Sequence, residues 1–169
     1  MPRRVPTCST IIVMGVSGSG KTTVGRALAG ELGWDFIDGD SFHSQESRAS
    51  IAAGIPLTDQ DREPWLARLN AIVATHKPRA RGLVLACSAL KKRYRDVLRQ
   101  ADSEAAFVYL RGNADLIAKR LSARSGHFAT PAILTSQMAT LEEPDHALAI
   151  DIEPDVETIV GTIRIELGV

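Results

Sequence analysis

Short apolar runs alternate with stretches of helical periodicity along the whole chain. Five runs of apolar residues predict strands at 10–14, 35–38, 82–87, 106–110 and 148–152. The segments between these runs place apolar residues three and four positions apart, which is typical of helices with one buried face. Strands that alternate with helices form a parallel sheet with helices on both faces and right-handed crossovers. We therefore expect an α/β fold.

Capping residues help to place the helices. A helix over 21–32 is expected to end at Gly33, and Asn113 is suited to cap the helix that follows the fourth strand. Thr130 and Pro131 have the order of an N-cap and a first helical residue, for a helix that reaches about residue 141. Further helices are predicted from residue 61, over 91–99 and across 159–167, whereas the polar stretch that ends at Gly54 is assigned no element. Trp65 shares a helical face with Leu69, which favours core packing for its ring.

Composition narrows the class of protein. A chain of 169 residues with 44% hydrophobic residues suits one domain, 1–169, which needs no disulfide or metal to fold. Twenty basic residues balance twenty acidic ones, which argues against a general nucleic-acid or acidic-membrane binder. The longest apolar runs are too short to span a bilayer, and no export signal is apparent. Two cysteines without metal-ligand spacing are typical of reduced thiols, so we expect a cytoplasmic protein.

A phosphate-binding loop stands between the first strand and the first helix. Residues 15–22, Gly-Val-Ser-Gly-Ser-Gly-Lys-Thr, match the pattern G-x-x-x-x-G-K-[ST] in the structural context that it requires. Glycines let successive backbone N–H groups point at phosphate oxygens, and the helix N-terminus adds a positive dipole end. Lys21 is expected to reach the β- and γ-phosphates and Thr22 to ligate Mg²⁺. The expected ATP-binding residues here are Gly15, Ser17, Gly18, Ser19, Gly20, Lys21, Thr22 and Thr23.

Two carboxylates follow the second strand. Asp38 and Asp40 should lie at the carboxyl edge of the sheet, beside the phosphate loop, where open α/β sheets bind ligands. A carboxylate there can accept the proton of an attacking hydroxyl, or help to hold Mg²⁺ through water. The alternative is that the pair only forms a turn or a cap. For His43, a hydrogen bond to substrate and a solvent-exposed or capping position remain open.

Several blocks of this sequence resemble the gluconate kinases, small relatives of the shikimate and nucleoside monophosphate kinases. The phosphate loop is followed by Asp-Gly-Asp-Ser-Phe-His at 38–43, and further matching blocks lie at 54–62, 64–66, 87–96, 124–128 and 141–144. The phosphate loop is shared by many NTPases. The Pro-Leu-Thr-Asp and Cys-Ser-Ala-Leu-Lys blocks are specific to this family. The chain departs from the family at Ser44, Ser47 and Ser50, where members usually have Pro and then an Asn…Lys pair.

The resemblance implies a P-loop NTPase fold with a small mobile helical lid at approximately 120–140. It also implies ATP- and Mg²⁺-dependent phosphorylation of D-gluconate to 6-phospho-D-gluconate, often by a homodimer. Carried over residue by residue, Asp40 is the base and a water-mediated Mg²⁺ ligand, while Lys21 and Arg124 stabilise the transferred phosphoryl group. The residues implied near the sugar acid are Asp40, His43, Arg62, Lys91, Arg95 and His127. Arg120 and Arg124 belong to the lid and are expected to bind ATP as well.

The charges of these residues support that assignment. A carboxylate ligand requires Arg or Lys, and Arg can bind it through two hydrogen bonds. Arg120 and Arg124 are four positions apart and so share a helix face, and Ser125-Gly126 after them can act as a hinge. Without a ligand, residues 91–99 would be interpreted as a solvated basic helix and the two arginines as surface charges.

Two other functions remain open. The first is a P-loop kinase of another small hydroxy acid or polyol, as in shikimate kinases, although the chain lacks their Gly-Gly-Gly triplet. The second is a nucleotide-binding regulatory module without kinase activity, although the Asn-Lys-x-Asp motif of GTPases is absent. Whether nucleotide turnover requires an acceptor distinguishes these functions.

Overall fold

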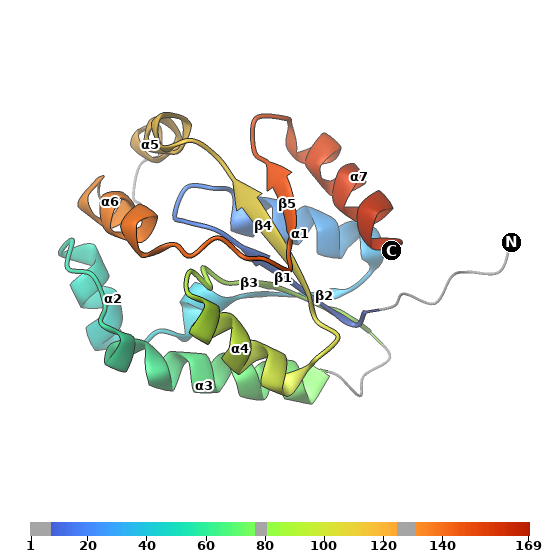
Figure 1. Cartoon of the computed structure of the whole chain (residues 1–169), viewed down its shortest axis with the longest axis horizontal. Coiled ribbons are helices and arrows are strands. Elements are labelled where there is room, and N and C mark those ends of the chain that lie inside the picture. The colour runs from blue at the N-terminus through green and yellow to red at the C-terminus, as the bar shows by residue number, and fades with distance from the viewer. Residues whose placement is uncertain (1–7, 77–80, 125–130) are drawn as a thin grey trace, which may run out of the picture.

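A single five-stranded parallel sheet forms the centre of the computed structural model, which describes residues 8–76, 81–124 and 131–169. Its strands are β1 (Thr10–Met14), β2 (Asp35–Asp38), β3 (Leu83–Ala86), β4 (Ala106–Arg111) and β5 (Leu148–Asp151), in the order β2-β3-β1-β4-β5 (Figure 1). Every pair of neighbours is parallel. The five predicted strands and the α/β class are therefore confirmed.

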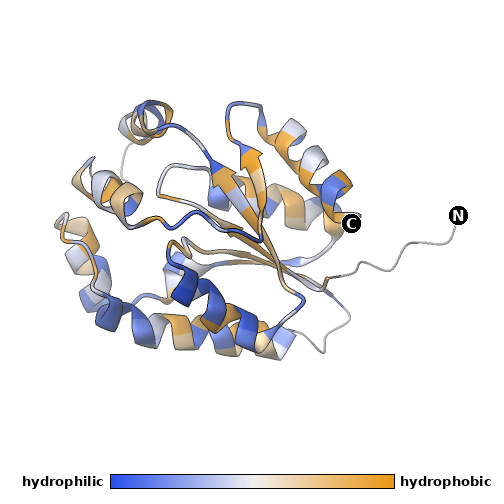
Figure 2. Cartoon of the chain, viewed as in Figure 1, coloured by the Kyte–Doolittle hydropathy of each residue, from blue (hydrophilic) through white to orange (hydrophobic). Residues whose placement is uncertain are grey.

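Helices cover both faces of this sheet. On one face lie α1 (Lys21–Leu32) and α7 (Val156–Leu167), and on the other α3 (Asp59–His76) and α4 (Lys92–Ala101) (Figure 1). Successive residues of β1 point to opposite faces, so Ile11 and Val13 pack in the first core and Ile12 and Met14 in the second. Figure 2 shows the strands as mainly apolar and the outer surface of α4 as hydrophilic.

The remaining elements gather at the carboxyl edge of the sheet. They are the 3₁₀ turn η1 (Gly39–Phe42) and the helices α2 (Gln45–Ala52), α5 (Ala114–Ser122) and α6 (Pro131–Thr140). Asp38 and Val13 both pair with Ala86 across the sheet. The strand register thus brings the phosphate loop after β1, the turn after β2 and the segment after β3 to one place.

Several expected caps and boundaries are confirmed. Gly33 ends α1 in the left-handed conformation, with φ of 67°, and the Asn113 side chain accepts a hydrogen bond from the Leu116 N–H at 2.8 Å. Two details differ from the prediction: residues 45–52 form α2, where no element was expected, and α3 begins at Asp59 rather than residue 61. Thr130, the predicted cap of α6, lies outside the described residues. The described helices include none that combines the length and the apolar character of a membrane span.

Candidate active site

The glycines of the phosphate loop shape a narrow backbone path between β1 and α1. Gly15 has a φ of 149° and Gly18 a φ of 81°, a region that side chains other than glycine rarely adopt. A Cβ atom on Gly15 would lie 2.8 Å from the Ser19 Oγ and 3.0 Å from the Leu110 carbonyl oxygen. A Cβ atom on Gly18 would lie 2.7 Å from Leu121 Cγ. Both positions therefore require glycine for the loop to pack against the end of β4 and against α5.

The groups inside this loop fit an anion. Helix α1 begins at Lys21 with no side-chain cap and no acidic residue in its first turn, so its first N–H groups are not capped by the helix itself. The Ser19 side-chain oxygen is buried and has no hydrogen-bond partner among the described residues. The Lys21 Nζ donates to the Val16 carbonyl oxygen at 3.0 Å. Uncapped donors and a cation in one cradle are the arrangement that binds phosphate.

Burial has the largest effect on the pKa values of Lys21 and of the neighbouring Cys87. It lowers the pKa of the Lys21 ammonium, while the nearby Asp40, Cys87 and Asp38 act in the opposite direction. Burial, together with the charge of Asp40, raises the pKa of Cys87 to about 12. The Cys87 thiol is therefore protonated at neutral pH, and the two aspartates are the acidic groups that balance Lys21.

Asp38 organises the turn that presents Asp40. Its Oδ2 accepts a hydrogen bond from the Thr22 Oγ1 at 2.7 Å, and its Oδ1 accepts one from the Asp40 N–H at 3.0 Å. Asp38 is thus the N-cap of η1 and also joins that turn to the start of α1. The Asp40 carboxylate is mostly exposed, with 68% of its side-chain surface accessible. A threonine hydroxyl beside two carboxylates fits Mg²⁺, which takes oxygen ligands and is usually held by one or two carboxylates together with phosphates.

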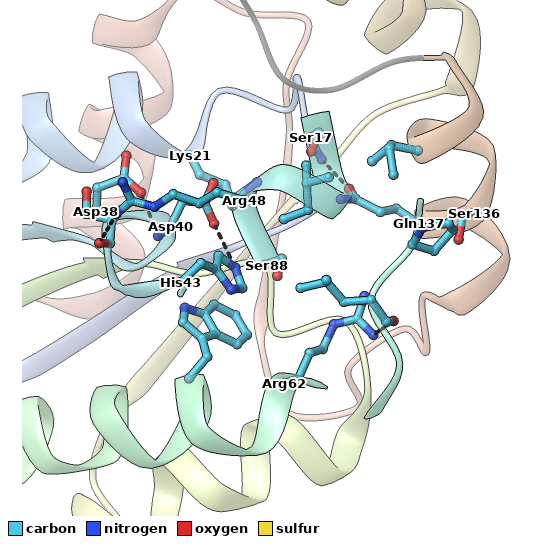
Figure 3. A pocket seen from close by; sticks show the side chains of 16 residues that line it. Ser17, Lys21, Asp38, Asp40, His43, Arg48, Arg62, Ser88, Ser136 and Gln137 are labelled. Carbon is cyan, nitrogen blue, oxygen red and sulfur yellow. Dashed lines mark hydrogen bonds and ion pairs between the residues drawn. The ribbon is translucent and has the colours of Figure 1, made fainter. Parts of the chain in front are cut away.

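Two cavities meet at Lys21 and Asp40. The smaller, of about 140 Å³, surrounds the phosphate loop and is lined by Gly18, Gly20, Thr22, Thr23, Leu121 and Arg124. The larger, of about 320 Å³, extends from the loop toward α2, α3 and α6 (Figure 3). Both are also lined by Ser17, Lys21, Asp40 and Ile51. A phosphate chain in the first cavity and an acceptor in the second would therefore meet beside Lys21 and Asp40.

His43 and Trp65 form the floor of the larger cavity. The His43 ring stacks on Trp65 with centroids 4.3 Å apart, and its Nε2 lies 4.0 Å from Asp40 Oδ1. Trp65 is buried in the core, as predicted, and its Nε1 donates to the Gly39 carbonyl oxygen at 2.8 Å. Burial lowers the pKa of His43, Asp40 raises it, and Arg62, Arg48 and Arg68 lower it further. His43 is therefore a neutral hydrogen-bonding group at neutral pH.

Arg62 faces the same cavity from α3. Its guanidinium donates to the Leu57 carbonyl oxygen and, at 3.4 Å, to the Tyr94 hydroxyl. Tyr94 in turn donates to Asp59. These contacts hold the guanidinium at the cavity wall without pairing it with a carboxylate.

The structure places Lys91 and Arg95 outside the lining of this cavity. The Lys91 Nζ forms an ion pair with Asp59 at 3.1 Å. Arg95 is buried, only 3% exposed, and donates to the carbonyl oxygens of Ala89 and Leu90 at 2.9 and 3.1 Å. Ala89 has a φ of 45°, so Arg95 supports a left-handed turn that follows the cavity residue Ser88. Both cations are thus engaged by the protein itself.

Arg120 lies in the last turn of α5, whereas Arg124 follows the helix, so the prediction that the two share a helix face is wrong. Arg124 is exposed and lines the smaller cavity. Arg120 donates to the Ile152 carbonyl oxygen at 2.6 Å, so it joins α5 to the end of β5. His127 and the expected hinge at Ser125-Gly126 lie outside the described residues.

The larger cavity also contains residues that sequence analysis did not single out, namely Arg48 on α2 and Ser136 and Gln137 on α6. The Gln137 Oε1 accepts a hydrogen bond from the Ser17 N–H at 2.7 Å, so α6 contacts the phosphate loop. The side chain of Ser44 accepts a hydrogen bond from Ser47 N–H, as an N-cap does. The Ser44 cap is the sequence signal that could have revealed Arg48, because it predicts a helix that places Arg48 and Ile51 on one face.

Comparison with known proteins agrees with this geometry. The family model for shikimate kinase matches residues 17–148. A probable gluconokinase of Xenopus tropicalis is 41% identical, over 93% of this chain and 92% of its own length. The thermoresistant gluconokinase of Escherichia coli (strain K12) is 41% identical, over 89% of each chain. The crystal structure of a gluconokinase from Sinorhizobium meliloti 1021 superposes with a TM-score of 0.86 at 41% identity, covering 98% of this chain and 94% of that one.

These matches confirm the resemblance and the P-loop kinase fold that were expected from the sequence. They extend over both cavities, from the phosphate loop to the last strand. The chain belongs to the gluconokinase family, among the P-loop kinases that the shikimate kinase model describes.

Proposed function

We propose that this protein transfers the γ-phosphoryl group of ATP to D-gluconate and forms 6-phospho-D-gluconate. The observation that supports this most directly is the junction of the two cavities at Lys21 and Asp40. The smaller cavity, which fits phosphate groups, opens there into the larger cavity, and Arg62 is among the residues that line the larger one. The relatives are named as gluconokinases, which indicates gluconate as the acceptor, and Arg62 is suited to bind the carboxylate of gluconate.

The residues at the junction have separate roles in this proposal. Lys21 and Arg124 approach the phosphoryl group from the loop and from the segment after α5, and they neutralise charge as it moves. Asp40 accepts the proton of the attacking hydroxyl, and its turn is held by Asp38. Thr22 and, through water, Asp40 would hold Mg²⁺, which would supply positive charge that offsets the negative charge of the phosphates.

The acceptor is held along the larger cavity. Arg62 binds the carboxylate, while neutral groups such as His43, Ser88 and Ser136 suit the hydroxyls of a sugar acid. Helix α6 covers this space and contacts the phosphate loop through Gln137, which suits a closing lid. A homodimer in the cytoplasm is also part of the proposal, and the two described cysteines, both buried and free, suit a reducing compartment.

An assay of ADP release with gluconate, sorbitol, shikimate and AMP as acceptors tests the function. Turnover should require an acceptor and should be fastest with gluconate. Sorbitol offers the same primary hydroxyl without the carboxylate, and a charged hydrogen bond contributes about 1.5–3 kcal/mol. Two such bonds predict a kcat/KM roughly a hundredfold lower for sorbitol. Equal turnover without any acceptor would contradict the kinase assignment, and equal turnover with sorbitol would contradict carboxylate recognition.

A further inference from the structure

Tyr94 joins an acidic residue, Asp59, to a residue of the larger cavity, Arg62. Tyr94 lies in the first turn of α4 and is buried, with 1% of its surface exposed, whereas Arg62 lines the cavity from α3 (Figure 3). The Tyr94 hydroxyl donates to Asp59 Oδ1 and accepts a hydrogen bond from Arg62 Nη1 at 3.4 Å. Tyr94 is not itself among the residues that line the cavity. An effect of its hydroxyl on a bound ligand would therefore pass through Arg62.

The neighbours of the Tyr94 hydroxyl determine where its proton points. Hydrogen bonds from Tyr94 and Lys91 lower the pKa of Asp59, so this carboxylate is ionised at neutral pH. Burial and the hydrogen bond to Asp59 raise the pKa of Tyr94, so its hydroxyl keeps the proton. A carboxylate accepts hydrogen bonds and a guanidinium only donates them. The proton therefore faces Asp59, and an oxygen lone pair faces Arg62.

Asp59 is paired with two other cations and not with Arg62. Lys91 Nζ lies 3.1 Å from its Oδ1, and Arg93 Nη1 lies 3.1 Å from its Oδ2. No carboxylate of the described residues lies within ion-pair distance of Arg62. The Tyr94 hydroxyl is bonded to both Asp59 and Arg62 and thus lies between their charged groups. This arrangement leaves the charge of Arg62 free to pair with an anionic ligand.

Arg62 also keeps hydrogen-bond donors for a ligand. Its Nη1 donates to the Leu57 carbonyl oxygen as well as to the Tyr94 hydroxyl. Its Nε and Nη2 have no hydrogen-bond partner within the described parts of the chain. An arginine has five N–H donors, so several remain unused. The contacts to Leu57 and Tyr94 hold one end of the guanidinium and leave the other available.

We propose that Tyr94 is a positioning residue for the acceptor, because its hydroxyl keeps the Arg62 guanidinium at the cavity wall and apart from Asp59. The inference rests on the proposed function, in which Arg62 binds the carboxylate of the acceptor, and it deepens that function. Without the hydroxyl, Arg62 is free to turn toward Asp59 and pair with it. A merely structural role of Tyr94 in the core would affect charged and neutral acceptors alike.

The test compares Tyr94→Phe with Tyr109→Phe. Tyr109 is a matched control, because it is a buried tyrosine of the same core that lies on β4 and has no hydrogen bond to Asp59 or Arg62. Steady-state kinetics are measured with gluconate and with sorbitol at saturating MgATP, and the thermal unfolding midpoint serves as the control for folding. Tyr94→Phe should lower kcat/KM for gluconate about fivefold or more, mainly through KM, and should change the value for sorbitol less than about twofold. Tyr109→Phe should match the unmodified protein on both acceptors.

A double-mutant cycle shows whether Tyr94 acts through Arg62. Once Arg62→Gln has removed the guanidinium, adding Tyr94→Phe should cause no further loss with gluconate. Equal losses with gluconate and sorbitol in Tyr94→Phe, or a full further loss on top of Arg62→Gln, would show a merely structural role and overturn the proposal.

The unmodified protein tests the proposed function separately. Equal kcat/KM for gluconate and sorbitol in the unmodified protein would overturn carboxylate recognition, and this role of Tyr94 with it. A clear preference for gluconate that Tyr94→Phe leaves unchanged would overturn the role of Tyr94 alone.

Discussion

At the scale of single residues, the site depends on a cation whose charge is costly to desolvate. Removal from water lowers the pKa of Lys21, and Asp40 and Asp38 partly restore it. The protein therefore holds Lys21 at the point where the two cavities meet, although this position disfavours its charged form. A position that disfavours a charge is typical of a functional group rather than a stabilising one.

Lys21→Ala should consequently remain folded and lose nearly all kinase activity. Loss of one preorganised donor to a developing charge lowers kcat by about 10²–10³. The measurement is kcat at saturating MgATP and gluconate, with the thermal unfolding midpoint as the control for folding. Near-normal turnover in this variant would contradict the role of the phosphate loop.

Asp40→Asn separates two roles of one carboxylate. The amide keeps the shape of the side chain but removes its basicity, and a positioned base contributes about 10²–10⁴ to the rate. We expect a kcat lower by a factor in that range and an affinity for MgATP within a few-fold of normal. If nucleotide binding is lost instead, Asp40 mainly serves the metal and a different group accepts the proton.

The sequence alone was sufficient to place those candidate site residues that directly follow the first two strands. The phosphate loop, Asp38, Asp40 and His43 follow directly from the ends of β1 and β2, and strand register alone brings them together. Basic residues were harder to place, because their position depends on which neighbours their long side chains reach. Asp59 engages Lys91, and two backbone carbonyls engage Arg95. No periodicity encodes those contacts.

At the scale of elements, strands and long helices were predictable and the short helix α2 was not. Only Ser47 is buried among its eight residues, so α2 has no apolar periodicity to detect. Its signal is confined to the Ser44 cap, which by itself is typical of turns as well. This element carries Arg48, so a residue that lines the larger cavity was missed together with its helix.

Helix α1 offers a matched pair of glycines for testing how closely this helix packs against the sheet. A Cβ atom on Gly25 would lie 2.7 Å from Phe36 Cε2, whereas one on Gly30 would have no heavy atom within 4 Å. Gly25→Ala should lower the free energy of unfolding by about 1–3 kcal/mol through overpacking against β2. Gly30→Ala should raise it by about 0.5–1 kcal/mol, because alanine favours helix. Denaturant unfolding measures both, and the opposite order would contradict this packing of α1.

At the scale of the whole molecule, two apolar cores share one sheet, and the larger cavity lies at the carboxyl edge of that sheet. Trp65 belongs to the core on the α3 side and also supports His43 in the cavity. Its Nε1 binds the Gly39 carbonyl oxygen in the turn of Asp40. Packing of that core and geometry of the site are therefore linked through one ring, and the protonation of His43 should affect the stability of the entire fold.

The expected sign follows from the pKa of His43, which lies below its ordinary value of 6.5 in the folded protein. As pH falls from about 7 to 5, the unfolded chain takes up a proton at His43 before the folded protein does, so this residue lowers the free energy of unfolding. Above about pH 7, His43 is neutral in both the folded and the unfolded chain and does not change the free energy of unfolding with pH. His43→Gln should therefore lose less stability than the unmodified protein between pH 7 and pH 5, whatever its stability at pH 7. The exposed His146→Gln is the control for the loss of a histidine, and the slope of His43→Gln is compared with it as well as with the unmodified protein. Denaturant unfolding at several pH values measures the slopes, and equal slopes for His43→Gln and the unmodified protein would show that His43 is not held neutral against Trp65.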